Sequence, residues 1–164
     1  MSFIENLLFP ISLYAAVACG LLGGLFFAFS NFVMNALSRI HPSNGIAAMQ
    51  SINITVLNPL FLALFLGTAL VCAVLLVFAA FRWQHAHAGW LLAGSLVYLA
   101  GGLLVTMACN VPLNDALAKL DPAKPESTQI WRSYISVWAN WNHVRTISCL
   151  ASAALFTIAI WRQT

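Results

Sequence analysis

Long apolar stretches separated by single charged residues dominate the pattern of this chain. Asp, Glu, Lys and Arg are absent between Glu5 and Arg39, between Arg39 and Arg82, and between Arg82 and Asp115. A further charge-free run, residues 146–161, lies near the C-terminus. Because a membrane-spanning helix needs about 20 apolar residues, the pattern predicts four spans, at about residues 7–37, 56–81, 89–109 and 144–161. We therefore predict an all-α fold, an integral membrane four-helix bundle that forms a single domain over residues 1–164.

Polar and turn-forming residues predict the connections between the spans. Residues 38–55 and 82–88 are expected to be loops, and residues 110–143 a long, partly helical loop between the third and fourth helices. Within this long loop, Asn114 or Asp115 is placed to start a short helix. The segment DPAKPES, residues 121–127, is a strong turn signal. Aromatic residues return from Thr128 onward, so we predict one helix from Thr128 to Trp161 that begins at the membrane interface and runs into the bilayer.

Composition supports a membrane protein. Hydrophobic residues make up 62% of the 164 residues and charged residues only 7%, whereas soluble domains carry roughly 25% charged residues. Lipid must therefore be the solvent for most of the surface, and we expect a multi-pass protein without a cleaved signal peptide. The formal charge of +3 forms no basic patch of the kind that binds nucleic acid. The expected partners are the bilayer and a hydrophobic small molecule or lipid, while a homo-oligomer and either membrane orientation stay open.

The last helix carries a polar and aromatic stripe. Trp131, Tyr134, Trp138, Asn142 and Arg145 advance by three or four residues at each step, so they fall on one helical face. An arginine inside a span costs about 2.5–3.5 kcal/mol, which favours a position of Arg145 toward the bundle or a water-filled cavity. The alternative is a belt of aromatic side chains at the membrane interface, with an arginine that extends to the surface.

Asparagines from the other three helices lie on the same side of the predicted membrane. Asn58 precedes Pro59 and suits the N-cap of the second helix. Asn31 lies in a stripe of the first helix that also contains Gly20 and Gly24, two glycines that favour close helix contacts, and it fits either an interhelical hydrogen bond or a cavity. One polar cavity with aromatic walls would unite Asn31, Asn53, Asn58, Asn110, Asn114, Trp138, Asn142 and Arg145.

Cysteines and histidines suggest no dedicated metal centre, so we expect neither a metal nor another cofactor. The cysteines lack CxxC spacing and are expected to be small buried hydrophobic residues. His85 and His87 form a pair in a short loop on the opposite side from the asparagines, where a solvated loop is the simpler interpretation. His41 and His143 lie on the same side as the asparagines, and metal binding near them stays open. The four cysteines are Cys19, Cys72, Cys109 and Cys149.

Three ordered motifs resemble a family of small four-helix membrane proteins, the anthrone oxygenase family, long treated as a domain of unknown function. They are NP at 58–59, NVPLNDAL at 110–117 and W-x3-N-x2-R at 138–145. The resemblance implies oxidation of an anthrone to an anthraquinone without a protein-bound cofactor, and its polar motif falls on Asn110, Asn114, Trp138, Asn142 and Arg145. With many bacterial members in the family, we expect a bacterial inner membrane protein.

The resemblance suggests roles for these residues. Arg145, Asn142 and Trp138 are the candidate catalytic residues: the first two could stabilise an oxyanion, and Trp138 could stack on a flat ring. His143 or His41 could act as the base, although His143 points about 100° away from Asn142 on an ideal helix. The candidate substrate-binding residues are Asn31, Asn53, Asn58, Asn110, Asn114 and Trp131. The alternatives are a non-catalytic protein that binds a lipid or apolar metabolite, an accessory subunit, and a purely structural role.

Overall fold

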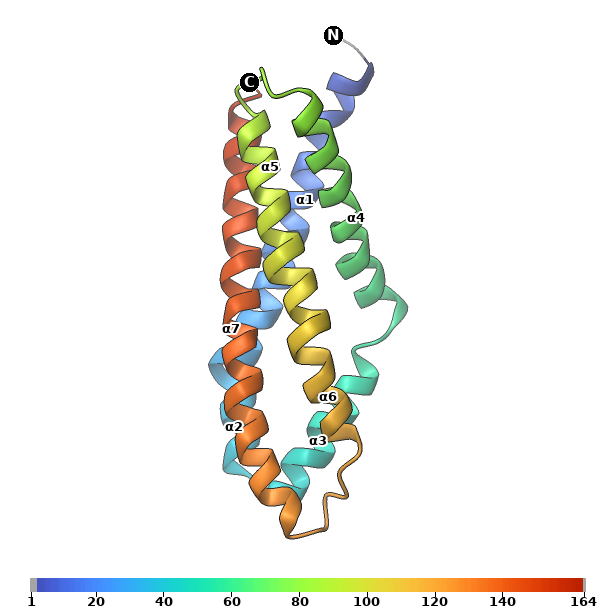
Figure 1. Ribbon diagram of the computed structural model, residues 1–164, viewed down its shortest axis with the longest axis vertical. Coiled ribbons are helices and arrows are strands. Elements are labelled where there is room, and N and C mark those ends of the chain that lie inside the picture. Colours follow the sequence, from blue (N-terminus) through green and yellow to red (C-terminus); the bar gives the residue numbers. More distant parts are fainter. Residues whose placement is uncertain (1–2, 164) are drawn as a thin grey trace.

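The computed structural model describes residues 3–163, with side chains from residue 7 onward, as four long helical rods that run side by side (Figure 1). Both termini lie at the same end of the bundle. Helices account for 88% of the structure, and the described residues contain no strand. Four helical segments are long and apolar enough to cross a membrane: Leu7–Arg39, Pro59–Phe81, Ala88–Ala118 and Pro125–Trp161. The predicted all-α membrane bundle is therefore confirmed.

Each rod is built from one or more helices. The first contains α1 (Phe3–Ala28), the π-helical stretch η1 (Phe29–Val33) and α2 (Met34–Arg39). The second contains α3 (Pro42–Thr55) and α4 (Pro59–Phe81). The third contains α5 (Ala88–Val97), the π-helical stretches η2 (Tyr98–Leu104) and η3 (Thr106–Asn110), and α6 (Val111–Ala118). The fourth is the single helix α7 (Glu126–Trp161).

Two expected loops are wrong in extent. Residues 38–55 were expected to be a loop, but they contain α3, which begins at Pro42 because proline is tolerated in the first helical turn. Likewise, the third rod does not end near residue 109. It continues into α6, which starts at Val111 with Pro112 in its first turn, and so earlier than Asn114 or Asp115. The predicted helix from Thr128 to Trp161 is confirmed as α7, which starts two residues earlier.

Small side chains let the upper halves of the rods pack closely. A Cβ atom on Gly23 would meet Leu150, one on Gly94 would meet Phe156, and one on Gly101 would overlap Ser148. The sequence predicts close helix contacts at Gly20 and Gly24, and this prediction is wrong. A Cβ on Gly24 would meet open space, and one on Gly20 would reach only Ala153. The cysteines are free as expected, and three of them, Cys19, Cys72 and Cys149, are buried in this upper core.

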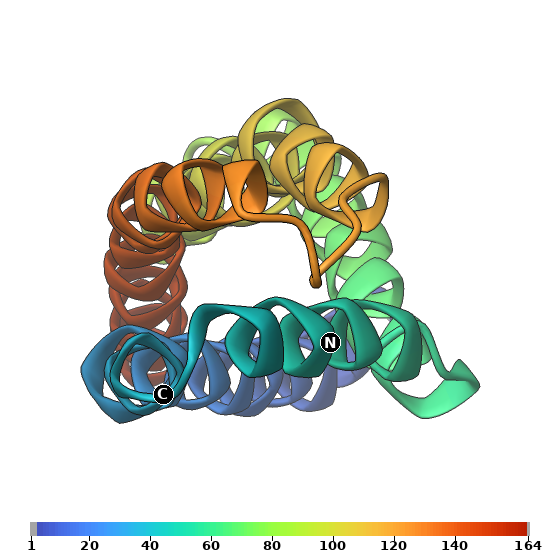
Figure 2. The same cartoon turned by 90° about the horizontal axis from the view of Figure 1, so that it is seen from below.

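A second hydrophobic cluster fills the lower half of the bundle. It joins α2, α3, α6 and the first half of α7 through Met34, Ile46, Met49, Leu117, Trp131, Tyr134 and Trp138. Figure 2, seen from below, shows α3 and α6 on opposite sides of this end of the bundle. Trp131 lies against the backbone of α3, where a Cβ on Gly45 would overlap its ring. The lower cluster therefore holds α3 against α7.

Exposed side chains indicate where the membrane ends. On α7 the exposed residues after His143 include Val144, Ile147 and Leu150, whereas the exposed residues up to His143 are mixed, with Ile130, Arg132, Val137, Asn140 and His143 among them. The 20 residue steps from Trp141 to Trp161 rise about 30 Å, which matches the hydrocarbon thickness of a bilayer. Exposed tryptophans at both ends, at 39% and 70% of their surface, are typical of membrane interfaces. The stretch from Trp141 to Trp161 therefore has the length and the end residues of a membrane span, within the longer apolar helix Pro125–Trp161.

Candidate functional site

Arg145 is buried in α7, one helical turn after Trp141, with only 5% of its surface exposed. Its Nη1 donates to Thr106 Oγ1 at 3.4 Å, and its Nη2 donates to Asn142 Oδ1 at 2.5 Å. The guanidinium carbon lies 4.3 Å from the ring centroid of Phe26 and 5.0 Å from that of Trp138. These rings stabilise the cation through their π faces. The Nε atom of Arg145 has no hydrogen-bond partner in the described structure.

Asn142 fixes the position of Arg145 from below and ties α7 to the first rod. Its Nδ2 donates to the carbonyl oxygen of Phe26 and to Ser30 Oγ, both at 2.6 Å. Its Oδ1 is thereby turned toward Arg145. Ser30 lies in the π-helical stretch η1, and Thr106 begins η3. Both partners that flank the arginine network thus lie in π-helical turns, which occur often at functional sites.

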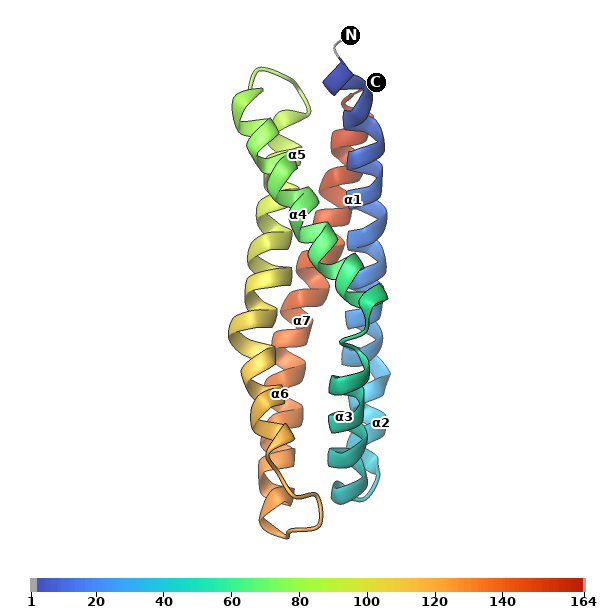
Figure 3. The same ribbon diagram turned by 90° about the vertical axis from the view of Figure 1, so that its right-hand side faces the viewer.

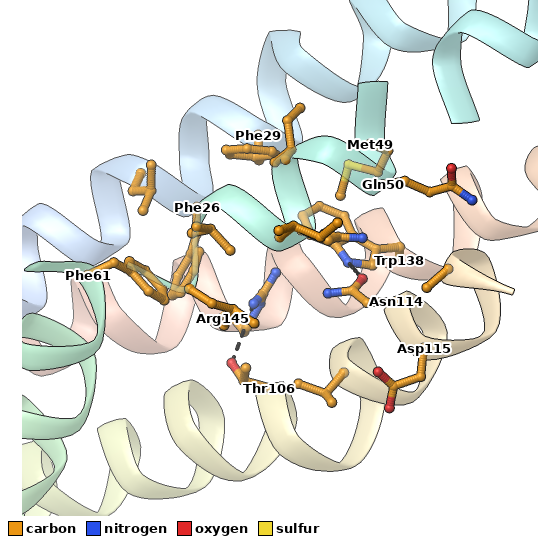
Figure 4. A pocket seen from close by; sticks show the side chains of 18 residues that line it. Phe26, Phe29, Met49, Gln50, Phe61, Thr106, Asn114, Asp115, Trp138 and Arg145 are labelled. Atoms are coloured by element: carbon orange, nitrogen blue, oxygen red, sulfur yellow. Dashed lines mark hydrogen bonds between the residues drawn. The ribbon is translucent and has the colours of Figure 1, made fainter. Parts of the chain in front are cut away.

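A second network surrounds Trp138. Asn114 Oδ1 accepts hydrogen bonds from Tyr134 Oη and from Trp138 Nε1, both at 2.9 Å. Asn110 Nδ2 donates to the backbone oxygen of Trp138 at 3.3 Å, while Asn110 Oδ1 has no partner. A buried Tyr or Trp needs such a partner for its polar atom. Asn114 therefore fixes the orientation of the indole beside Arg145 (Figure 4), and Asn110 holds the backbone of the same residue.

These networks form one wall of a cavity of about 610 Å³. This volume lies in the range of about 300–1,000 Å³ that is typical of pockets for small molecules. Figure 4 shows Arg145 and Thr106 on facing helices, with Phe26, Phe29 and Phe61 on the apolar side. The polar lining consists of Gln50, Asn53, Thr106, Asn114, Asp115, Trp138 and Arg145. The apolar lining consists of Leu25, Phe26, Phe29, Met49, Ile52, Ile54, Val56, Leu57, Phe61, Val111 and Ala118.

Most of the predicted site residues gather at this cavity. All five residues of the α7 stripe are buried as the helical period predicts. Asn53, Asn114, Trp138 and Arg145 line the cavity. Asn110 and Asn142 are buried directly behind its wall. Trp131 lies farther away, stacked on Tyr134 with ring centroids 5.5 Å apart.

Two predicted residues lie elsewhere. Asn58 is exposed and caps α4, with its Oδ1 accepting from the backbone nitrogen of Phe61 at 3.0 Å, as the capping prediction requires. Asn31 is also exposed, and it contributes only its backbone oxygen, which accepts from Asn35 Nδ2. The neighbouring Ser30 contacts Asn142 instead. Neither Asn31 nor Asn58 lines the cavity.

Sequence reasoning missed several cavity residues. Thr106 lies four residues before Asn110, so the helical period could have placed it on the same face. Asp115 follows Asn114 in the NVPLNDAL motif and is the only carboxylate among the cavity-lining side chains of the described residues. Gln50 and Phe29 gave no usable signal, because their positions depend on how α3 and η1 pack.

The histidines lie outside the cavity. His41 and His143 are exposed, and His41 Nδ1 is 2.8 Å from Ser43 Oγ. In the loop at the opposite end, the rings of His85 and His87 stack with centroids 5.3 Å apart. Partial burial, followed by the charge of His85, lowers the pKa of His87. Among the residues that the structure describes, no group of three or more His, Cys, Asp or Glu side chains is placed to hold a metal ion.

Comparison with known proteins gives one match. The family model described as anthrone oxygenase matches residues 61–155, which is more than half of the chain and extends from the start of α4 through most of α7. Thr106, Asn114, Trp138 and Arg145 all lie within the matched residues. No match was found among curated proteins or among solved structures. The chain belongs to the anthrone oxygenase family.

Proposed function

We propose that the protein is a membrane oxygenase that converts an anthrone, or a similar planar hydrophobic ketone, to a quinone without a protein-bound cofactor. The observation that carries this proposal is a buried guanidinium, that of Arg145, in the wall of an aromatic cavity within the anthrone oxygenase family. Location in a bacterial inner membrane is part of the same proposal. Each step below assigns a role to residues that line or support this cavity.

Binding uses the aromatic and cationic walls together. A flat ring system lies against Trp138 and the phenyl rings of Phe26 and Phe29, where stacked or tilted aromatic contacts are favourable. The ketone oxygen accepts a hydrogen bond from Arg145. The guanidinium carries five N–H donors, of which two are used by Thr106 and Asn142, so donor capacity remains for a ligand.

The first chemical step removes a proton from the ring carbon opposite the ketone. The electron pair of the broken C–H bond moves into the ring, and the ketone oxygen becomes an aryloxide. Positive charge at Arg145 stabilises this anion, as oxyanion donors do in other enzymes. Asp115 is the proton acceptor in this proposal, directly or through a water molecule, because this exposed residue supplies the carboxylate in the cavity lining and no histidine among the described residues lines the cavity.

Dioxygen then acts as the oxidant. The electron-rich carbon forms a C–O bond with dioxygen, and the resulting peroxide anion takes up a proton. Loss of the remaining proton from the same carbon breaks the O–O bond and releases water, which leaves the second ketone of the quinone. In balance, one anthrone and one dioxygen give one anthraquinone and one water.

Turnover of anthrone by the protein in lipid nanodiscs tests the proposal. Oxygen uptake and the absorbance of anthraquinone are measured together, with the uncatalysed oxidation subtracted. Arg145→Met should lower kcat about 10²–10³-fold, the loss seen when one oxyanion donor is removed. Arg132→Met is the matched control, because Arg132 is exposed on the same helix and does not line the cavity. Absence of catalysed oxygen uptake, or equal rates for both variants, would contradict the proposal.

Hydrogen exchange without oxygen tests the role of Asp115 separately. Under anaerobic conditions in heavy water, the wild-type protein should catalyse deuterium incorporation at the reacting carbon of anthrone. Asp115→Asn should lower this exchange about 10²–10⁴-fold, the contribution typical of a positioned base. Glu126→Gln, an exposed residue outside the cavity, serves as the control. If Asp115→Asn still takes up oxygen, another group must accept the proton, and the oxygenase proposal stays intact.

A further inference from the structure

The cavity wall has an apolar edge between the second and third rods. On one side lies the segment that joins α3 to α4, where Ile54 and Leu57 line the cavity while 76% and 64% of their surfaces are exposed. On the other side, Val111 at the start of α6 both lines the cavity and is exposed. Residues that are at once exposed and cavity-lining mark an opening, and on the α6 border it continues from Val111 to Asp115 and Ala118. Figure 3 faces this side of the molecule, with α3 and α6 on its two borders.

At the lower end of the cavity, Gln50 joins the two borders. Its Nε2 donates to the backbone oxygens of Leu117 and Leu120, at 2.9 and 3.0 Å. These carbonyls lie at the C-terminal end of α6, where helix oxygens lack intrahelical partners. The bonds join α3 to α6, and the buried Met49 and Leu117 pack beside them. This connection narrows the lower end of the cavity, where Asp115 and Ala118 of α6 are also exposed and line it.

The opening lies at the level of the membrane surface. Leu57 is two residues before Pro59, where the membrane-spanning helix α4 begins. The apolar exposed surface continues into the span on both borders, through Leu60 on α4 and Met107 on η3. Large exposed apolar side chains in this position are solvated by lipid and not by water.

We propose, on the basis of the proposed function, that the ligand reaches the cavity sideways from the lipid bilayer, through the opening between Leu57 and Val111. The class of ligand follows from the arrangement of the walls. Arg145 and Thr106 receive one polar edge of the molecule, and the opening receives an apolar edge. The substrate is therefore a planar amphiphile that partitions into the membrane interface, with its ketone directed inward and its apolar substituents directed toward lipid.

Binding kinetics of a product-like probe test the route. The probe is 1,8-dihydroxyanthraquinone, added to the protein in lipid nanodiscs and followed by its own absorbance in stopped-flow mixing. Leu57→Trp places a bulky ring in the opening, whereas Leu60→Trp makes the same change three residues away at an exposed position that does not line the cavity. Leu57→Trp should slow association and dissociation alike by about tenfold, within the one to three decades over which mutants of one site vary. The Kd should change by less than about twofold, because an obstructed route leaves the end states unchanged. Leu60→Trp should match the wild-type rates.

Other outcomes separate the route from the proposed function. Unchanged rates in Leu57→Trp, with tight binding retained, would overturn lateral access and leave the oxygenase proposal in place. A changed Kd with an unchanged association rate would assign Leu57 to the binding surface and also overturn the route. If the wild-type protein does not bind the probe, the ligand class of the proposed function fails, and the route fails with it. Val111→Trp, on the opposite border, gives the same test if Leu57→Trp does not fold.

Discussion

Replacement of Arg145 by methionine tests whether the arginine binds the ligand or only stabilises the fold. Methionine keeps an unbranched side chain of similar length but removes the charge and all five N–H donors. The substitution removes the bonds to Thr106 and Asn142 and the contacts with the Phe26 and Trp138 rings. It also removes the cost of burying a cation, and exchange of buried charges for apolar side chains is often neutral or stabilising.

The structure sets the expected magnitudes. Asn142 Oδ1 loses its partner in Arg145→Met, which costs about 1–3 kcal/mol for a buried acceptor. The removed desolvation cost offsets part of this loss, so the free energy of unfolding should fall by less than about 3 kcal/mol. The affinity for the ligand should fall by a larger factor than this change in stability suggests. A hydrogen bond from a charged donor contributes about 1.5–3 kcal/mol, which corresponds to about 10- to 150-fold in Kd.

Equilibrium titration with 1,8-dihydroxyanthraquinone in nanodiscs measures the Kd, and thermal unfolding of the same samples measures stability. Arg145→Lys should lie between the wild type and Arg145→Met, since lysine keeps the charge but loses the planar fork of donors. Arg132→Met should leave the Kd unchanged. A Kd of Arg145→Met within about twofold of wild type, together with a large drop in thermal stability, would refute a ligand-binding role and leave only a structural one.

Three further sets of substitutions test other parts of the structure. Asn58→Ala removes the cap of α4, so it should lower the free energy of unfolding by about 1 kcal/mol, measured by thermal unfolding. Anthrone turnover should stay at the wild-type rate. A loss of turnover without a loss of stability would show that Asn58 belongs to the site. Gly101→Ala places a methyl group on Ser148, so overpacking should lower the free energy of unfolding by about 1–3 kcal/mol. Gly24→Ala, whose methyl group meets open space, should be neutral or stabilising by up to about 1 kcal/mol. Similar shifts in the melting temperatures of the two variants would contradict this packing. Asn142→Asp should weaken binding of the quinone probe more than Asn142→Ala does, as measured by titration, and the reverse order would show that Asn142 matters for position alone.

The four long apolar helices and the buried face of α7 could be predicted from the sequence for the same reason, which is regularity. Charges are so rare that their positions divide the chain into spans, and α7 is one uninterrupted helix whose period of 3.6 residues carries from Trp131 to Arg145. The first rod lacks this regularity. Its π-helical stretch from Phe29 to Val33 adds residues to a turn, and Ser30 faces the site where a uniform helix suggested Asn31.

The helix α3 could not be predicted, because its stability depends on distant residues. Residues 42–55 carry no charges and are too short and too polar to be a span, so their pattern predicts a loop. The buried α3 residues Ile46 and Met49 are spaced by three, but they find their partners, Leu117 and Trp131, about 70 or more residues away in the chain. Gln50 and Asn53 reach the cavity only because α3 docks there. Helical propensity alone does not contain this information.

The choice of neutral partners for Arg145 bears on what the site can bind. The hydrogen-bond acceptors around the guanidinium are a threonine hydroxyl and an asparagine amide oxygen, and its other close contacts are aromatic rings. An aspartate in place of Asn142 could hold the guanidinium in a similar position, but it would cancel the positive charge within a low-dielectric site. Neutral acceptors orient the arginine and leave its charge uncompensated, at a depth where an unpaired cation is costly. A ligand that becomes anionic during the reaction would recover part of that cost, so the interaction strengthens as charge develops on the ligand. This is the behaviour required for stabilising an aryloxide more than its parent ketone.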